Sequence, residues 1–109
     1  MISEYRAMRL ILMFDLPSTE DYEKKEYTLF RKQLLKNGYI MMQFSIYTKP
    51  TNVQVKLEQE LKKISKYIPT SGNIRLLSIT EKQYSNMIMI LGKKKINEIY
   101  NNAERYIKI

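Results

Sequence analysis

The most constraining feature of the sequence is a short apolar run, residues 8–14, which ends abruptly at Asp15 and then at Pro17. A bounded run rich in large aliphatic side chains predicts a buried strand rather than a helix. Proline cannot donate a hydrogen bond to a sheet, so the strand must stop by Pro17. We therefore expect Asp15 at the rim of a central strand, where its carboxylate can reach water or a ligand.

Two helices are predicted after this strand, over 19–37 and 52–67, because apolar residues recur at helical spacing. Ser18 is the expected N-cap of the first, and Gly38 is expected to end it in a left-handed conformation. The apolar side of the first helix, which predicts its core face, carries Tyr22, Tyr27, Leu29, Phe30 and Leu34. Its basic side, which is either solvated or phosphate-binding, carries Lys24, Lys25, Arg31, Lys32 and Lys36.

Further strands are predicted over 39–49, 74–80 and 87–91, with a polar or short helical turn at 81–86. In the first of these, alternation turns the apolar side chains toward the helices, namely Met42, Phe44 and Ile46. The opposite face, which can hydrogen-bond a partner or face water, then carries Gln43, Ser45 and Tyr47.

Read plainly, the elements follow the order β-α-β-α-β-β, whereas the ferredoxin-like order is β-α-β-β-α-β. The two agree if 39–49 holds two short strands around a bend. The compact solution is then an α+β, ferredoxin-like antiparallel sheet with two helices on one face. Strands 8–14 and 87–91 are apolar on both sides, which predicts a homodimer through the open sheet face. We expect a domain over 1–92 and a basic C-terminal segment and strand over 93–109 for dimer or partner contacts.

The charge balance indicates a polyanionic partner. Nineteen Lys and Arg against eleven Asp and Glu give a net charge of +8, which favours nucleic acid before an anionic membrane. A solvated, lysine-rich surface without a partner is the alternative. Candidates for phosphate contact are Arg6, Arg9, Lys24, Arg31, Lys32, Lys36, Lys93 and Lys94.

Several chemistries are excluded by composition. The chain has no cysteine and no histidine, which removes thiolate nucleophiles, thiolate metal sites and a serine triad. Two copies of Asp15 near a two-fold axis could instead hold one divalent ion and polarise a phosphodiester. The alternative is that Asp15 caps the first helix or bonds the loop around Ser18. The sequence has neither the features of a signal peptide nor an apolar segment that would span a bilayer, which predicts a cytoplasmic protein without a membrane partner.

Three stretches together resemble the CRISPR-associated Cas-two family, and most of all the versions that accompany type II systems. The first is 10–17, which holds the family's strand-end aspartate. The second is 30–39, which runs into a Gln-x-Ser-aliphatic-aromatic pattern at 43–47, and the third is 76–84.

The resemblance implies a ferredoxin-like homodimer that supports duplex DNA and bridges Cas-one integrase dimers during spacer acquisition in antiviral defence. It also implies that Asp15 is the position at which some members, described as nucleases acting on RNA or DNA, hold magnesium. Here Met41 and Met42 replace an arginine often found before the Gln-x-Ser pattern. A DNA-bridging scaffold, a magnesium-dependent endonuclease and a ferredoxin-like RNA-binding or regulatory module are the three hypotheses.

Overall fold

The computed structural model describes residues 7–52 and 57–92, which form one antiparallel sheet with strand order β2-β3-β1-β4. This arrangement confirms the α+β, ferredoxin-like fold, including the division of 39–49 into two strands. The elements in chain order are β1 (Ala7–Asp15), α1 (Asp21–Lys36), β2 (Ile40–Gln43), β3 (Ile46–Asn52), α2 (Leu57–Ile64), the 3-10 helix η1 (Ser65–Tyr67), β4 (Asn73–Thr80) and α3 (Glu81–Ser85).

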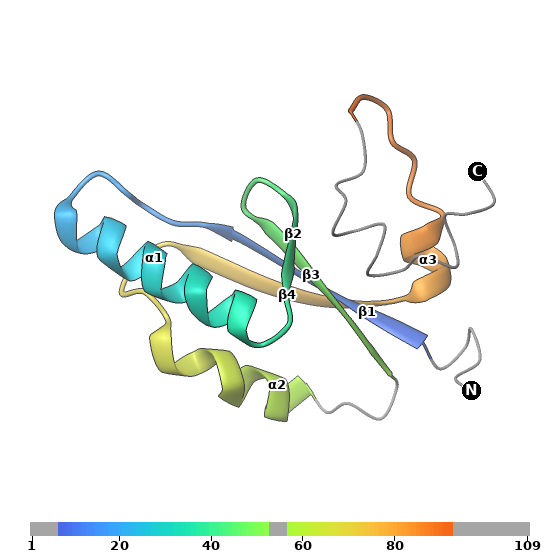
Figure 1. Cartoon of the computed structure of the whole chain (residues 1–109), viewed down its shortest axis with the longest axis horizontal. Helices are drawn as coiled ribbons and strands as arrows, with labels where there is room; N and C mark the ends of the chain where they lie inside the picture. Colours follow the sequence, from blue (N-terminus) through green and yellow to red (C-terminus); the bar gives the residue numbers. More distant parts are fainter. Residues whose placement is uncertain (1–6, 53–56, 93–109) are drawn as a thin grey trace.

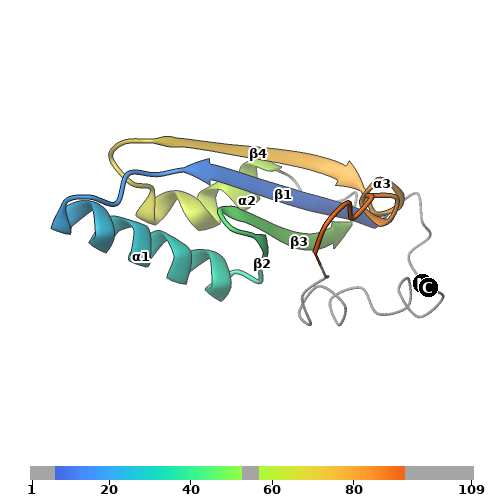
Figure 2. The same cartoon turned by 90° about the horizontal axis from the view of Figure 1, so that it is seen from above.

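The described residues form two layers, with α1 and α2 on one face of the sheet (Figures 1 and 2). The core lies between these layers, because β1 turns alternate large side chains toward the helices. Leu10, Leu12 and Phe14 of β1 are buried there. The side chains that pack with them are Phe30, Leu34, Tyr39, Tyr47 and Ile64. The odd-numbered residues of β1 therefore face away from α1 and α2.

The ends of α1 depart in part from the sequence prediction. Ser18 is not the N-cap; the helix starts after Glu20, whose backbone N–H donates to the Glu23 carboxylate at 2.9 Å. Gly38, with φ of +91°, ends the helix in the left-handed conformation as predicted. The apolar side of α1 is only partly core, since Tyr22 and Leu29 are exposed.

The β2–β3 hairpin corrects the predicted faces of this region. Gln43 pairs with Ile46, so Phe44 and Ser45 form a two-residue turn in which Ser45 has a φ of +66°. The turn interrupts the alternation assumed for a continuous strand. As a result Phe44 is 79% exposed, whereas Tyr47, predicted on the opposite face, is 1% exposed and lies in the core.

Residues 87–91 do not form the predicted strand. They follow α3 without regular structure, and all five apolar side chains are exposed, Ile90 to 93%. The apolar pattern predicts that these side chains are buried, but no strand among the described residues buries them. Four predictions lie outside the described residues: Arg6, Lys93, Lys94 and the C-terminal segment over 93–109.

Candidate functional site

Asp15 is the last residue of β1, and its exposed side chain lies at the rim of the sheet as predicted. The neighbouring strand holds this end of β1 in place, because Asp15 pairs with Asn73 of β4. The loop before β4 comes so close that a Cβ on Gly72 would lie 2.6 Å from the Asp15 carbonyl oxygen. Gly72 also has a φ of +107°, so glycine is required here on both counts.

An open pocket of about 490 Å³ surrounds the Asp15 carboxylate on the face turned away from α1 and α2. Its wall includes the hairpin turn, which is tied to β1 by the Phe14 N–H donating to the Ser45 carbonyl at 3.0 Å. The residues that line the pocket are Met13, Phe14, Asp15, Phe44, Ser45, Ile46, Asn73 and Arg75. The pocket thus combines one carboxylate and one guanidinium with an amide and a hydroxyl.

The Asp15 side chain makes no hydrogen bond or ion pair with the described residues. The alternative in which it caps the first helix or bonds the loop around Ser18 is therefore wrong, and the helix is capped instead by the reciprocal pair Glu20 and Glu23. Within 7–52 and 57–92, no three carboxylate, histidine or cysteine residues cluster as a metal site would require. Asp15 is the sole carboxylate of the pocket, and the guanidinium of Arg75 opposes a cation there. One chain alone is thus a poor fit to magnesium.

Arg9, predicted to contact phosphate from an exposed face, is fully buried, and that expectation is wrong. Its Nη2 and Nε atoms donate to the two carboxylate oxygens of Glu81 at 2.7 and 3.0 Å. Its guanidinium also lies 4.1 Å from the centre of the Tyr84 ring. Both partners belong to α3, so Arg9 fastens this helix to β1.

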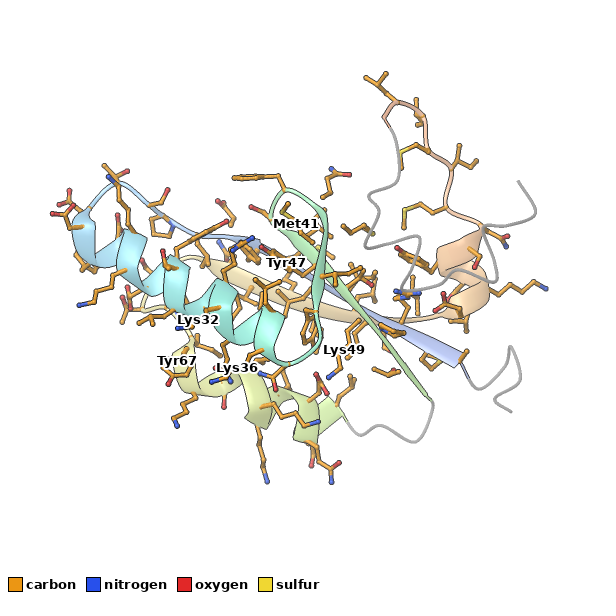
Figure 3. All side chains as sticks on the ribbon, viewed as in Figure 1. Lys32, Lys36, Met41, Tyr47, Lys49 and Tyr67 are labelled. Atoms are coloured by element: carbon orange, nitrogen blue, oxygen red, sulfur yellow. The ribbon has the colours of Figure 1, made fainter. Side chains whose placement is uncertain are left out.

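The basic side of α1 is placed as predicted. Lys24, Arg31, Lys32 and Lys36 are exposed, and none forms an ion pair with another described residue. Figure 3 shows Lys32 and Lys36 projecting from α1 toward the side on which Tyr67 of η1 lies, and the two elements are in contact. A row of unpaired cations on one helix is suited to a phosphate backbone. We call Lys24, Arg31, Lys32 and Lys36 the α1 cation row.

Lys49 is a basic residue whose charge is paired with a buried carboxylate. Glu60 of α2 is buried and accepts hydrogen bonds from the Tyr39 hydroxyl at 3.0 Å and the Lys49 Nζ at 2.9 Å. Burial raises the pKa of Tyr39 well above its usual value, and the adjacent Glu60 carboxylate adds to the rise. These contacts hold α2 against the sheet, and Lys49 is therefore paired.

The residues of the Gln-x-Ser pattern have separate places in the hairpin. Gln43 is exposed at the end of β2, Ser45 forms the turn beside the pocket, and Tyr47 stacks on Phe14 with ring centres 5.7 Å apart. The Tyr47 hydroxyl is buried without a hydrogen-bond partner among the described residues. Burial raises the pKa of Tyr47, and the nearby Arg31 guanidinium partly opposes that rise.

Arg75 and Asn73 are pocket residues that sequence reasoning missed. Arg75 is the one charged residue of β4 and lies opposite Met13 of β1, and an isolated charge within a strand was the one available signal. Arg75 also supplies a guanidinium to the pocket from β4, on a different strand from the arginine position that holds Met41 or Met42 here.

Comparison with known proteins agrees with this architecture. The family model described as CRISPR associated protein Cas2 matches residues 8–87. A protein from Ligilactobacillus salivarius named CRISPR-associated endoribonuclease Cas2 is 44% identical over 92% of this chain and 98% of its own length. Proteins of the same name from Treponema denticola and Streptococcus mutans are 39% and 40% identical over 92% of this chain, covering 98% and 91% of their own lengths.

None of the helices in the described part of the chain has the length and apolar character that crossing a membrane requires. The match to the family model spans β1 to the residues just after α3, and so includes the Asp15 pocket and the α1 cation row. The chain belongs to the CRISPR-associated Cas2 family, which gives it a CRISPR-associated role.

Proposed function

We propose that the chain is a homodimeric scaffold of CRISPR adaptation, which binds duplex DNA and bridges Cas-one integrase dimers during spacer acquisition. Family membership supports this proposal, and one structural observation carries it. The two broad faces of the molecule differ in chemistry, because the α1 cation row covers one while the other leaves apolar side chains of the sheet uncovered. A second copy would cover the apolar face and leave the cations available to phosphate.

Several apolar side chains outside the core are exposed in the described part of the chain. Leu77 of β4 is 50% exposed on the sheet face, and Met13 of β1 and Ile46 of β3, on the same face, are only partly buried. The exposed segment 87–91 adds five more apolar side chains. Where exposed apolar side chains gather into a patch, the patch marks an interaction site. An identical subunit is the simplest cover because a two-fold contact matches one surface to itself.

The DNA-binding part of the proposal is tested by the double variant Arg31→Ala/Lys32→Ala. Removing two phosphate contacts should lower duplex affinity and reduce the slope of log K against log salt by about two. Fluorescence anisotropy across a salt series measures both quantities. Binding that is unchanged in affinity and slope would assign the α1 cation row to solvent.

A matched control is the double variant Lys62→Ala/Lys66→Ala, which removes the same charge from exposed positions on α2 and η1. It should retain more affinity than the α1 variant. Equal losses would mean that net charge, rather than a duplex lying along α1, determines binding. Thermal melting of both variants checks that the fold is intact, since Arg31 lies near the buried Tyr47 hydroxyl.

A magnesium-dependent endonuclease is the second candidate, and the exposed Asp15 carboxylate with its pocket is the observation that favours it. The relatives carry the name endoribonuclease. Because one chain supplies one carboxylate, an ion would need Asp15 from both subunits, with the Asn73 amide and Ser45 hydroxyl as neutral oxygen ligands. A bound magnesium ion would polarise a phosphodiester of RNA or DNA.

The variant Asp15→Asn separates the two candidates. It keeps the size and polarity of the side chain but removes the charge that a divalent ion requires. The scaffold proposal predicts that, at concentrations where the variant is dimeric, spacer integration with the Cas-one integrase persists while any magnesium-dependent cleavage disappears. Loss of integration in a variant that remains folded and dimeric would contradict a purely architectural role.

A further inference from the structure

One corner of the open sheet face holds two opposite charges among apolar side chains. Asp15 of β1 and Arg75 of β4 are both exposed and both line the same pocket. Their strands are paired so that Arg75 lies opposite Met13, and Asp15 lies opposite Asn73. Asp15 and Arg75 are therefore diagonal neighbours on the same face, with Cα atoms about 7–8 Å apart.

Neither charge is satisfied within the described part of the chain. The ion pairs formed there involve Arg9, Lys49 and Lys63, and Asp15 and Arg75 take no part in them. A carboxylate and a guanidinium left unpaired at the border of an apolar surface become costly once that surface is covered. A partner that covers this face and brings a cation for Asp15 and an anion for Arg75 would satisfy both charges.

A single small ion does not meet both needs. A phosphate at Arg75 would be repelled by the Asp15 carboxylate, and a metal ion at Asp15 would be repelled by the Arg75 guanidinium. A second copy of this surface meets both where the two-fold axis passes midway between Asp15 and Arg75, because rotation by 180° about that axis sets each acid against the other subunit's base. An isologous contact repeats every such interaction twice.

We propose that Asp15 of each subunit pairs with Arg75 of the partner subunit, and that these two reciprocal ion pairs set the register of the dimer. This inference rests on the homodimer of the proposed function and deepens it. Arginine and carboxylate form bidentate, geometrically specific pairs. The pairing also holds Asp15 away from metal, so in this chain the carboxylate serves first as an assembly residue.

Charge reversal tests the proposal. Asp15→Arg gives each subunit two bases at this corner, and Arg75→Asp gives it two acids. In either homodimer the reciprocal pairs become repulsive, and the dissociation constant measured by analytical ultracentrifugation should rise about tenfold or more. The double variant Asp15→Arg/Arg75→Asp restores opposite charges and should recover most of the affinity.

Mixing the two single variants separates pairing between subunits from pairing within one. In the heterodimer, each arginine of the Asp15→Arg subunit faces an aspartate of the Arg75→Asp subunit, whereas within each subunit the charges stay alike. Native mass spectrometry should therefore find heterodimer well above the statistical half. A mixture of Asp15→Arg with Lys25→Asp is the matched control, since Lys25 is exposed on α1 and its reversal changes net charge equally.

Each outcome bears on a different claim. A wild-type chain that stays monomeric would overturn the homodimer itself. A dimeric wild type whose single reversals keep their affinity would overturn only the pairing. Weakened single variants that are rescued neither by the double variant nor by mixing would place both residues in the interface without pairing them to each other. Circular dichroism of each variant confirms that the subunits are folded.

Discussion

The two ends of β1 each carry a charged residue, but only one of the two charges is paired within the described part of the chain. Arg9 and Asp15 lie on the same face of the same strand, yet Arg9 is fully buried and Asp15 is exposed. Arg9 has its counter-charge in Glu81, with both guanidinium contacts at 3.0 Å or less, and an aromatic ring from Tyr84 over it. Asp15 has no charged partner among the described residues, although Arg75 shares its pocket.

The difference separates a charge used for folding from one available to another molecule. At the Arg9 end the chain supplies α3 as its own cover, and α3 completes the ion pair. At the Asp15 end the sheet is bordered by a hairpin turn and a loop, which leave an open pocket. A charge satisfied within the chain supports the fold, whereas an unsatisfied charge on an apolar face points to an assembly contact.

The largest expected effect is a loss of stability on substitution of Arg9, at the end of β1 where the charge is paired. Replacing Arg9 with alanine leaves the Glu81 carboxylate buried without its cation, which should lower the free energy of unfolding by about 3–5 kcal/mol. Urea denaturation followed by circular dichroism measures this loss. Asp15→Ala is the comparison variant, and its unfolding curve should match that of the wild type at concentrations low enough for both to be monomeric. Equal losses in the two variants would erase the contrast between the ends of β1.

A smaller effect on stability is expected from removing the buried hydroxyl of Tyr39, which is paired, than from substituting Arg9. Tyr39 donates to the buried carboxylate of Glu60, whereas the Tyr47 hydroxyl has no partner among the described residues. Tyr39→Phe should cost about 1.5–3 kcal/mol, as for a hydrogen bond to a charged group. Tyr47→Phe should cost nothing, or should stabilise the fold, when measured by the same denaturation.

Alkaline pH sharpens the comparison of the tyrosines. Folding raises the pKa of Tyr39, so the folded state holds the phenol proton more tightly than the unfolded chain does. That contribution is complete below about pH 10, the usual pKa of tyrosine, and is lost as pH rises beyond it. Between about pH 9 and pH 11, the wild type should therefore lose more free energy of unfolding than the Tyr39→Phe variant does. Parallel curves would show that Tyr39 does not contribute in this way.

The sequence predicted correctly those elements whose ends are marked by a proline or a glycine. Pro17 and Gly38 mark the ends of β1 and α1; β1 is a bounded apolar run, and α1 has apolar residues at helical spacing. The hairpin was predicted in the wrong phase, because alternation cannot reveal a two-residue turn that moves Tyr47 into the core. The apolar pattern of 87–91 signals that these side chains need cover. It does not say whether the cover comes from the same chain.

The charged residues show a similar limit. Arg9 was wrongly predicted to be exposed. Its partner Glu81 is 72 residues away in sequence, and only the packing of α3 brings the two side chains together. Arg75 was missed because its relation to Asp15 depends on the register of β1 with β4. Asp15, by contrast, was located correctly at the rim, since the proline that follows it fixes where the strand must stop.

The solution mass of the chain over residues 1–109 tests the central claim most directly, namely that the exposed part of the sheet face is closed by an identical subunit. Sedimentation equilibrium at micromolar concentration should give twice the chain mass of 13.1 kDa, and the Asp15→Arg variant should shift toward the single-chain mass. A folded wild-type protein that sediments as one chain throughout that range would contradict the claim.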